Sequence, residues 1–357
     1  MDIWKDILAA LSGVLNGLPQ GLLALTFGFA SIPTALAFMV GAAGNAATSN
    51  VAVISYQAET ITLAGTMGKN MRERLSMIFF GAAILLVIGL FGVLETLIGW
   101  IGPVITTGMM AGVGIMLSKV AWDMAKGDRI VGIVSMFSAL VVYFWTKDLV
   151  YTITASVVMS SIAYAITQKK GLETTDRPAV KEGFHLQKLM VNPSVIRGAL
   201  AMVCLNIGAN IAFGKINGEI ANKAVNIDTL TIISSLADMV SSIFGGAPVE
   251  IIISATASAP HAVWSGVLMM VLMAIVLITG LLPKIGKYVP SASIAGFLFV
   301  LGAIVTLPSN AAMALTGEGA GPGIVGGVTM VVTAITDPFL GMLSGVIVQF
   351  LMSVFGF

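Results

Sequence analysis

The chain has 357 residues, of which 57% are hydrophobic and 10% charged, and its formal net charge is +1. Soluble domains carry about 25% charged residues, so this composition excludes a soluble globular protein. Long unbroken apolar runs, such as residues 77–97 and 263–282, are typical of membrane-spanning helices rather than of alternating barrel strands. One cysteine and two histidines provide neither a disulfide framework nor a metal cluster. We therefore expect an all-α, multi-pass membrane protein without a cofactor.

Fourteen apolar segments follow one another along the chain. Their expected limits are residues 5–28, 30–46, 48–65, 76–97, 100–122, 130–146, 148–167, 195–214, 227–243, 248–258, 261–282, 289–307, 322–335 and 337–355. A full span needs about 20 residues, so this many segments fit only if some are short. Segments three (48–65) and ten (248–258) are therefore expected to be half-length.

A polar linker at residues 168–192 separates two nearly equal halves, 1–167 and 193–357. VVYFWT at 141–146 matches VVTAIT at 331–336, and an acid follows each, Asp148 or Asp337. WIGPV at 100–104 lies where KIGKY lies at 284–288. The shared order predicts an internal repeat, although a coincidence between glycine-rich apolar stretches is the alternative. Seven spans per half would make the repeats inverted in the membrane.

Segments three and ten carry the strongest functional signal. Both begin with small and polar residues, and each contains a carboxylate, Glu59 or Glu250. Irregular backbone at membrane depth is stable only inside protein or beside a water-filled cavity. A pair of interrupted segments in matching places is typical of a transporter's binding site. We therefore expect a secondary transporter rather than an enzyme, with no catalytic residues.

We expect both segments to start a half-helix that aims free N–H groups at a solute. In segment ten, Gly245 and Gly246 allow a tight path, and Pro248 suits the first helical turn, which would contain Glu250. In segment three, polar residues could cap the helix, and Glu59 would follow two to three turns later. These candidate caps are Asn45, Thr48, Ser49 and Asn50.

Other polar residues lie inside apolar segments. Asn206 and Asn210 are one helical turn apart, so their amides need a neighbouring helix or a ligand as partner. Pro19 is expected to kink the first segment beside the amide of Gln20. Asp238 is expected to make a structural hydrogen bond. The acids at segment ends should be solvated or capping; they are Glu95, Asp123, Asp148 and Asp337.

The charge distribution predicts an orientation. With fourteen spans, thirteen of the eighteen lysines and arginines fall on one side, together with the 168–192 linker. The positive-inside rule makes that side cytoplasmic and places both termini outside.

Several stretches resemble a known group. Asn206-Ile207-Gly208, SLADMVSSIFGGAPVE at 235–250, PVITTGMMAGVGIML at 103–117 and the spacing from Glu250 to Trp264 resemble the nucleobase–cation symporter-2 family, in its hypoxanthine/guanine permease branch. KDILAALSGVLNGLPQG at 5–21 resembles the first segment of sulfate permeases (SulP), and SSIFGGAPV at 241–249 fits them equally well. The nucleobase family has an acid at the position of Asn206, and a second alignment moves its segment-ten glutamate from Glu250 to Ser254.

Both resemblances imply the uracil-permease fold of seven plus seven inverted repeats. Segments 1–4 and 8–11 would form a core that holds substrate between the half-helices. Segments 5–7 and 12–14 would form a gate, and the core would move against it as an elevator. The resemblance further implies a homodimer, and it places the linker outside, against the charge bias.

The leading expectation is a transporter of purine or pyrimidine nucleobases in a prokaryotic plasma membrane, surrounded by lipid, coupled to H⁺ or Na⁺ and without a nucleic-acid partner. The alternative is a SulP-like transporter of small inorganic or organic anions, and a third class is a channel or scaffold. Candidate ion-coupling residues are Glu250 and Glu59. Candidate substrate-binding residues are Gln20, Ser49, Asn206, Asn210, Glu250 and Ser254.

Overall fold

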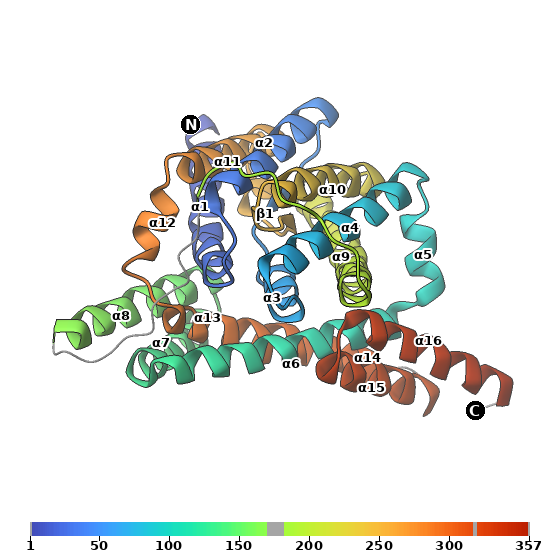
Figure 1. Cartoon of the computed structure of the whole chain (residues 1–357). Coiled ribbons are helices and arrows are strands. Elements are labelled where there is room, and N and C mark those ends of the chain that lie inside the picture. The colour runs from blue at the N-terminus through green and yellow to red at the C-terminus, as the bar shows by residue number, and fades with distance from the viewer. Residues whose placement is uncertain (1, 170–181, 317–319, 356–357) are drawn as a thin grey trace. The chain divides into compact units, whose positions relative to one another are not determined.

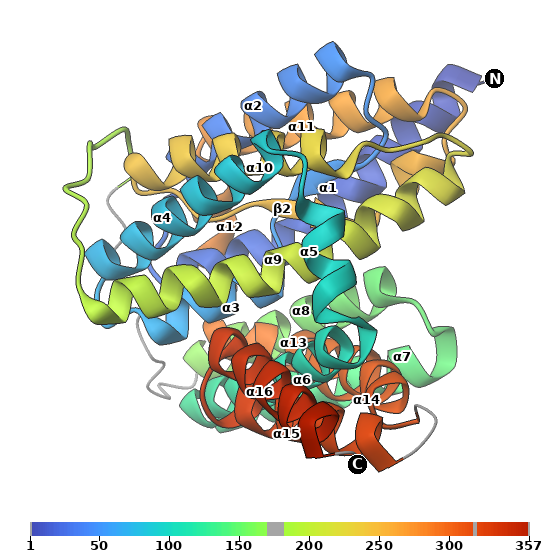
Figure 2. The same cartoon turned by 90° about the vertical axis from the view of Figure 1, so that its right-hand side faces the viewer.

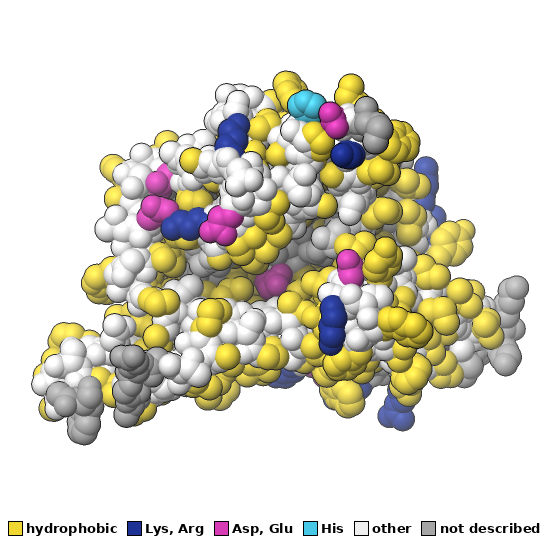
Figure 3. All heavy atoms as spheres, turned by 180° about the vertical axis from the view of Figure 1, so that it is seen from behind, with side chains coloured by type: hydrophobic (Ala, Val, Ile, Leu, Met, Phe, Trp, Pro, Cys, Tyr) yellow, Lys and Arg dark blue, Asp and Glu magenta, His cyan; other side chains and the backbone are white. Residues whose placement is uncertain are grey.

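The computed structural model describes residues 2–169, 182–316 and 320–355, and nearly all of its regular structure is helical. In this part of the chain, eight helices are long and apolar enough to cross a membrane. Many hydrophobic side chains and few charged ones lie on the face shown in Figure 3. The expected mostly helical, polytopic membrane fold is confirmed.

The chain forms two compact units, each built from both halves of the sequence (Figure 1). Unit 1 comprises residues 1–95 and 178–285, and unit 2 comprises residues 96–177 and 286–357. Of the three boundaries between the units, one lies in α5 (Leu94–Ile101) and one in α12 (Leu281–Gly286), and the third lies outside the described residues. The inverted relation of the sequence repeats stays a prediction.

Unit 1 combines membrane-length helices with two short strands. Its elements are α1 (Asp2–Thr26), α2 (Ser31–Thr48), β1 (Val53–Ser55), α3 (Ala58–Met67), α4 (Met71–Leu90), α9 (Pro193–Ile220), α10 (Ile227–Ile243), β2 (Glu250–Ile252), the 3₁₀-helix η1 (Ala255–Ser258) and α11 (Ala262–Ile278). The strands pair antiparallel, with Ser55 opposite Glu250. All six strand residues are buried. β1 packs against α2 and α11, and β2 against α9 and α10 (Figure 2).

Side chains from the surrounding helices satisfy the irregular backbone beside the strands. The Asn45 amide donates to Ala52 O at 2.6 Å, and the Asn217 amide donates to Ile252 O at 2.8 Å. The Val249 N–H donates to the Asp238 carboxylate at 2.6 Å, which is the structural hydrogen bond expected for Asp238. Backbone without helical bonds is therefore enclosed by protein, as membrane depth requires.

Segment three differs from its prediction. Ser49 adopts a left-handed conformation (φ 52°) and ends α2, so it does not cap a following helix. The half-helix α3 begins only at Ala58, which places Glu59 in its first turn rather than two to three turns into it. The β-branched run around Val53 and Ile54 favours strand, and pairing with β2 supplies the hydrogen bonds that a helix would have made.

Segment ten also begins as a strand. Glu250 lies on β2, and Pro248 precedes it, so the prediction of a helical turn at Pro248 was wrong. The only helix in the segment is η1, whose N-terminal cap is Ser254. Gly245 has φ 97°, and a Cβ at Gly246 would lie 2.7 Å from the backbone nitrogen of Thr34. These two glycines therefore provide the tight path that the sequence predicted.

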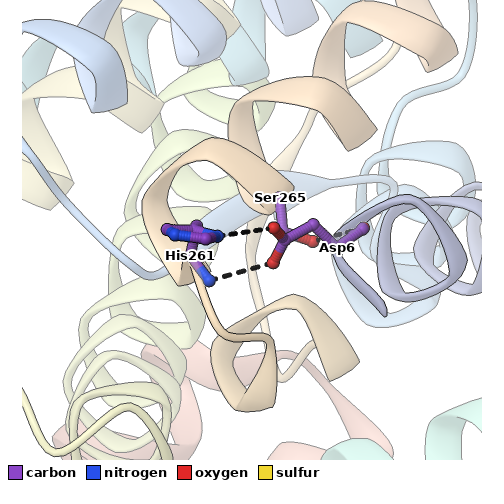
Figure 4. A network of polar contacts seen from close by, with 3 residues as sticks. All are labelled: Asp6, His261 and Ser265. Carbon is purple, nitrogen blue, oxygen red and sulfur yellow. Dashed lines mark hydrogen bonds and ion pairs between the residues drawn. The ribbon is translucent and has the colours of Figure 1, made fainter. Parts of the chain in front are cut away.

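Hydrogen bonds connect the start of α11 to α1 (Figure 4). The Asp6 carboxylate accepts a hydrogen bond from the backbone N–H of His261 at 2.9 Å and contacts Nδ1 of the same residue at 2.7 Å. The Ser265 hydroxyl donates to the Asp6 carbonyl at 2.8 Å. Asp6 thereby caps a helix that is distant in sequence. α1 itself continues on both sides of Pro19.

Unit 2 consists of helices only, as far as the structure describes it. They are α6 (Pro103–Gly127), α7 (Arg129–Thr146), α8 (Leu149–Lys169), the 3₁₀-helix η2 (Ser291–Ile294), α13 (Ala295–Phe299), the π-helix η3 (Val300–Thr306), α14 (Leu307–Leu315), α15 (Ala320–Ile335) and α16 (Pro338–Phe355). Asp148 accepts from Val150 N, and Asp337 accepts from Leu340 N, so the predicted capping roles are confirmed.

Candidate functional site

A buried polar network lies around the strand pair of unit 1. Glu250 on β2 is 2% exposed, and its Oε1 accepts a short hydrogen bond from the Asn206 amide of α9. The Thr60 hydroxyl of α3 lies 3.5 Å from Asn206 Oδ1 and also contacts the Gln57 side chain, which precedes α3. A hydroxyl has only one proton, so Thr60 can donate to one of these oxygens at a time. The network joins the start of α3 to β2 through α9.

A second carboxylate lies beside Glu250. The side chains of Asp238 on α10 and Asn210 on α9 both lie within hydrogen-bonding range of the Glu250 carboxylate. Among the described residues, neither acid forms an ion pair with a lysine or arginine. Two buried carboxylates repel each other when both are ionised. A proton or a metal cation on this pair would remove that repulsion, so the pair has the chemistry of a coupling site.

Several buried polar atoms here lack a hydrogen-bond partner of ordinary length in the described part of the chain. They are Glu250 Oε2, both amide atoms of Asn210, and Ser55 Oγ. Buried polar groups are normally paired with protein, water or a ligand. A carboxylate oxygen and an amide left unpaired beside each other therefore indicate a place that an ion, a solute or water completes.

The half-helix α3 is the α-helix that begins soon after β1, whereas β2 is followed by the short 3₁₀-helix η1. The side chain of the α3 cap residue Gln57 accepts no hydrogen bond from a backbone N–H of the helix. Glu59, 8% exposed, occupies the first turn, where the helix dipole stabilises a carboxylate. On the opposite side, the Ser254 hydroxyl already accepts the N–H of Thr256 at 3.2 Å. Segment three therefore contains a short α-helix and segment ten only a 3₁₀-helix, so their two N-termini are not equivalent as expected.

Comparison with known proteins identifies the fold. No protein-family model matches the chain, and no curated protein matches it. Among solved structures, the transmembrane domain of a cyanobacterium bicarbonate transporter, BicA, matches with a TM-score of 0.73 and 14% identity, over 97% of this chain and 98% of that one. The murine anion transporter Slc26a9 in its inward-facing state matches with a TM-score of 0.75 and 15% identity, over 99% of this chain and 69% of that one. A further SLC26A9 structure gives 0.72 and 14%, over 99% and 66%.

The chain has the fold of these anion transporters. At such identities the likeness establishes the fold alone. The matched proteins, BicA and Slc26a9, are membrane transporters, not enzymes, and they belong on the sulfate-permease side of the two resemblances seen in the sequence.

The structure brings three of the predicted site residues together, Asn206, Asn210 and Glu250. Ser254 lies four residues after Glu250 and caps η1. Gln20 is partly exposed on α1. Ser49 is exposed at the end of α2, where its carbonyl accepts a hydrogen bond from Lys223 Nζ at 2.9 Å. Ser49 thus has a helix-terminating role.

Sequence reasoning missed two members of the network and one contact. Gln57 and Thr60 flank Glu59 at a spacing of three, which places them on one face of a helical turn. That spacing was the available signal for these two residues. The proximity of Asp238 to Glu250 had no local signal, because an α-helix and a separate strand supply the two acids.

Proposed function

We propose that this protein is a secondary transporter of a small inorganic or organic anion, with its substrate held beside the β1–β2 pair of unit 1. The fold shared with a bicarbonate transporter and with Slc26a9 over nearly the whole chain carries this proposal. The N-terminus of α3, where the Gln57 side chain caps no backbone N–H, supplies a positive dipole end for an anion. Asn206 and Asn210 supply amide donors.

The acids at the site favour coupled rather than simple transport. An anion entering next to ionised Glu250 and Asp238 would be repelled in a low-dielectric interior. A proton or Na⁺ bound first at Glu250 removes that repulsion, and the anion in turn stabilises the bound cation. Glu59, in the first turn of α3, is the second candidate for the coupling ion. Co-transport of an anion and a cation follows from this mutual stabilisation.

The order of elements supports the seven-plus-seven repeat within this proposal. Each half contains two long helices, a strand followed by a short helix, and four further membrane segments. β1 and β2 occupy the same place in the two halves and pair antiparallel, as a two-fold relation would require. We assign unit 1 as the moving core and unit 2 as the gate of an elevator in a homodimer, in a prokaryotic plasma membrane.

Uptake into proteoliposomes tests the function. Purified protein is reconstituted, and uptake of labelled bicarbonate, sulfate, uracil and guanine is measured with inward gradients of H⁺ or Na⁺ and without a gradient. We expect gradient-stimulated uptake of an anion and no uptake of either base. Base uptake without anion uptake would establish the nucleobase alternative. Uptake of none of these solutes, from protein that remains folded, would contradict both.

The role of Glu250 has a matched control. Glu250→Gln keeps the shape and the contact with Asn206 but removes the charge. Glu95, an exposed acid paired with Lys215 at 3.1 Å in the same unit, is replaced in the control Glu95→Gln. We expect Glu250→Gln to abolish stimulation by the ion gradient and Glu95→Gln to leave it intact. Gradient stimulation that survives in Glu250→Gln would move the coupling role to Glu59.

A further inference from the structure

An apolar groove opens on the surface of unit 1 between α4 and α9. It has a volume of about 550 Å³, and every side chain that lines it is apolar: Phe80, Ala83, Ile84, Val87, Ile88, Val191, Ile196, Ala199 and Leu200. Val87 and Ile196 are each 51% exposed along it. Both helices are long and apolar enough to cross a membrane, so the groove lies at the depth of the hydrocarbon chains.

The groove has a polar end. α4 begins at Met71 and α9 at Pro193, and these two starts lie together, because Met190 N donates to Ser76 Oγ at 3.0 Å and the Asn192 amide donates to Glu73 at 3.3 Å. The groove residues of α4 begin at Phe80, about 13 Å further along the helix at 1.5 Å per residue. The groove therefore begins beside the start of α9, at Val191 and Ile196, and on α4 it runs from the middle of the helix toward its C-terminal end.

Basic side chains gather at that end. Arg72 donates to the carbonyls of Lys188 and Leu189, at 2.5 and 3.1 Å, and it retains three further N–H groups. Lys188 is exposed, and its segment leads directly to Val191 in the groove. Arg197 is exposed on α9 next to the groove residue Ile196. The nearby acid Glu73 is buried and accepts hydrogen bonds from Lys69 N and Asn192.

We propose that the α4–α9 groove binds an anionic phospholipid, with one acyl chain in the groove and the phosphate at the basic group Arg72 and Lys188. A saturated chain fits a long channel walled by branched aliphatic side chains. Guanidinium and ammonium groups at the headgroup level attract anionic lipid by about 1 kcal/mol each, which is about fivefold in affinity. The exposed Val191 (67%) lies between the groove and the basic group, where a glycerol backbone would sit.

Native mass spectrometry of delipidated protein tests this site. The protein is titrated with phosphatidylglycerol or phosphatidylcholine of identical chains, and retained lipid is counted. We expect at least a fivefold preference for phosphatidylglycerol. Lys188→Gln should reduce the preference about fivefold and leave the weaker retention of phosphatidylcholine unchanged. Ala83→Phe, which fills the groove, should reduce retention of both lipids about tenfold.

Two further variants keep the test decisive. Ala165→Phe makes the same change at an exposed position of α8 in unit 2 and should leave lipid retention unchanged. Ile196→Gln alters the groove wall at a position exposed enough to tolerate the change, and it replaces Ala83→Phe if that variant melts earlier in detergent. Equal retention of the two lipids by the unaltered protein, or retention unaffected by both groove variants, would overturn the proposal. A dimer that only the groove variants dissociate would show that a second copy occupies the groove.

Discussion

The two units bury different kinds of polar side chain. In the part of the chain that the structure describes, the buried amides all lie in unit 1, as do all the buried acids except Asp337; these amides are Asn45, Asn50, Gln57, Asn206, Asn210 and Asn217. Unit 2 buries mainly hydroxyls, such as Ser135, Ser156 and Thr329.

This difference separates a binding region from a packing region. A hydroxyl in a membrane helix can donate to a carbonyl of its own preceding turn, as Thr329 does to Val325 O at 2.8 Å. It is then largely satisfied without a ligand. An amide or carboxylate has more bonding capacity than its own helix can meet. Among the described residues, the unpaired amide and carboxylate atoms, at Asn45, Asn210 and Glu250, all lie in unit 1, whereas the unpaired side-chain atoms of unit 2 are hydroxyls. Both units bring helices close at small residues, and in unit 2 this occurs at Gly114 and Gly302.

The largest expected effect comes from Asn206→Asp. This change replaces the amide donor to Glu250 with a second acceptor, so a hydrogen bond to a charged group is lost and a like charge is added. The lost bond alone is worth about 1.5–3 kcal/mol, so we expect gradient-driven uptake to fall at least tenfold. Asn226→Asp is the control, since Asn226 caps α10 and aspartate caps equally well. Uptake by Asn206→Asp equal to that of the unaltered protein would show that the donor is dispensable.

The packing role of unit 2 is tested at Gly114. A Cβ there would lie 2.8 Å from Gly302 O and 2.9 Å from Leu307 N, both backbone atoms that cannot turn aside. We expect Gly114→Ala to destabilise the protein by about 1–3 kcal/mol, measured by thermal unfolding in detergent. In unit 1, Gly13→Ala meets the Met269 side chain at 2.8 Å, and a flexible methionine can move. An equal loss of stability in Gly114→Ala and Gly13→Ala would contradict the expected difference between the two positions.

The sequence was sufficient for the features that depend on composition and local pattern. Long apolar runs predicted the spans of α7, α10 and α16 to within a residue or two. Glycines at 245 and 246 predicted a tight backbone path. The acids Asp148 and Asp337 predicted helix caps, because capping depends on residues only a few positions apart.

The sequence was insufficient where long-range pairing decides the structure. β1 and β2 are three residues each and are stable only because they pair across almost 200 positions of sequence inside a helical unit. A short β-branched run alone cannot be distinguished from a piece of buried helix. The error at Pro248 and the misplaced cap at Ser49 both follow from this, and so does the missed contact of Asp238 with Glu250.

A smaller effect is expected at Ser135, the centre of the hydroxyl cluster in unit 2. Its hydroxyl donates to Ser293 O at 2.8 Å, contacts Ser156 Oγ at 2.9 Å and accepts from Gly296 N at 2.9 Å. Ser135→Ala leaves buried partners unpaired, so we expect a loss of about 1–2 kcal/mol in unfolding free energy and unchanged uptake per folded molecule. Ser138→Ala, which removes a hydroxyl bonded within its own helix, serves as control. A change in ion dependence in Ser135→Ala would mean that unit 2 also takes part in coupling.

The smallest effect is expected where Asp6 contacts His261 at the edge of unit 1. His261 is 56% exposed and Asp6 11%, so water screens their interaction, and such pairs are worth about 0–1 kcal/mol. Asp6→Asn keeps an oxygen that can accept the His261 N–H, whereas Asp6→Ala removes this cap of α11. We expect thermal unfolding to register a loss of about 1 kcal/mol in Asp6→Ala and less in Asp6→Asn. Equal losses would show that the charge of Asp6, and not its hydrogen bond to the His261 N–H, stabilises the contact between α1 and α11. Charge would then matter at this surface contact as well as in the buried network at Glu250.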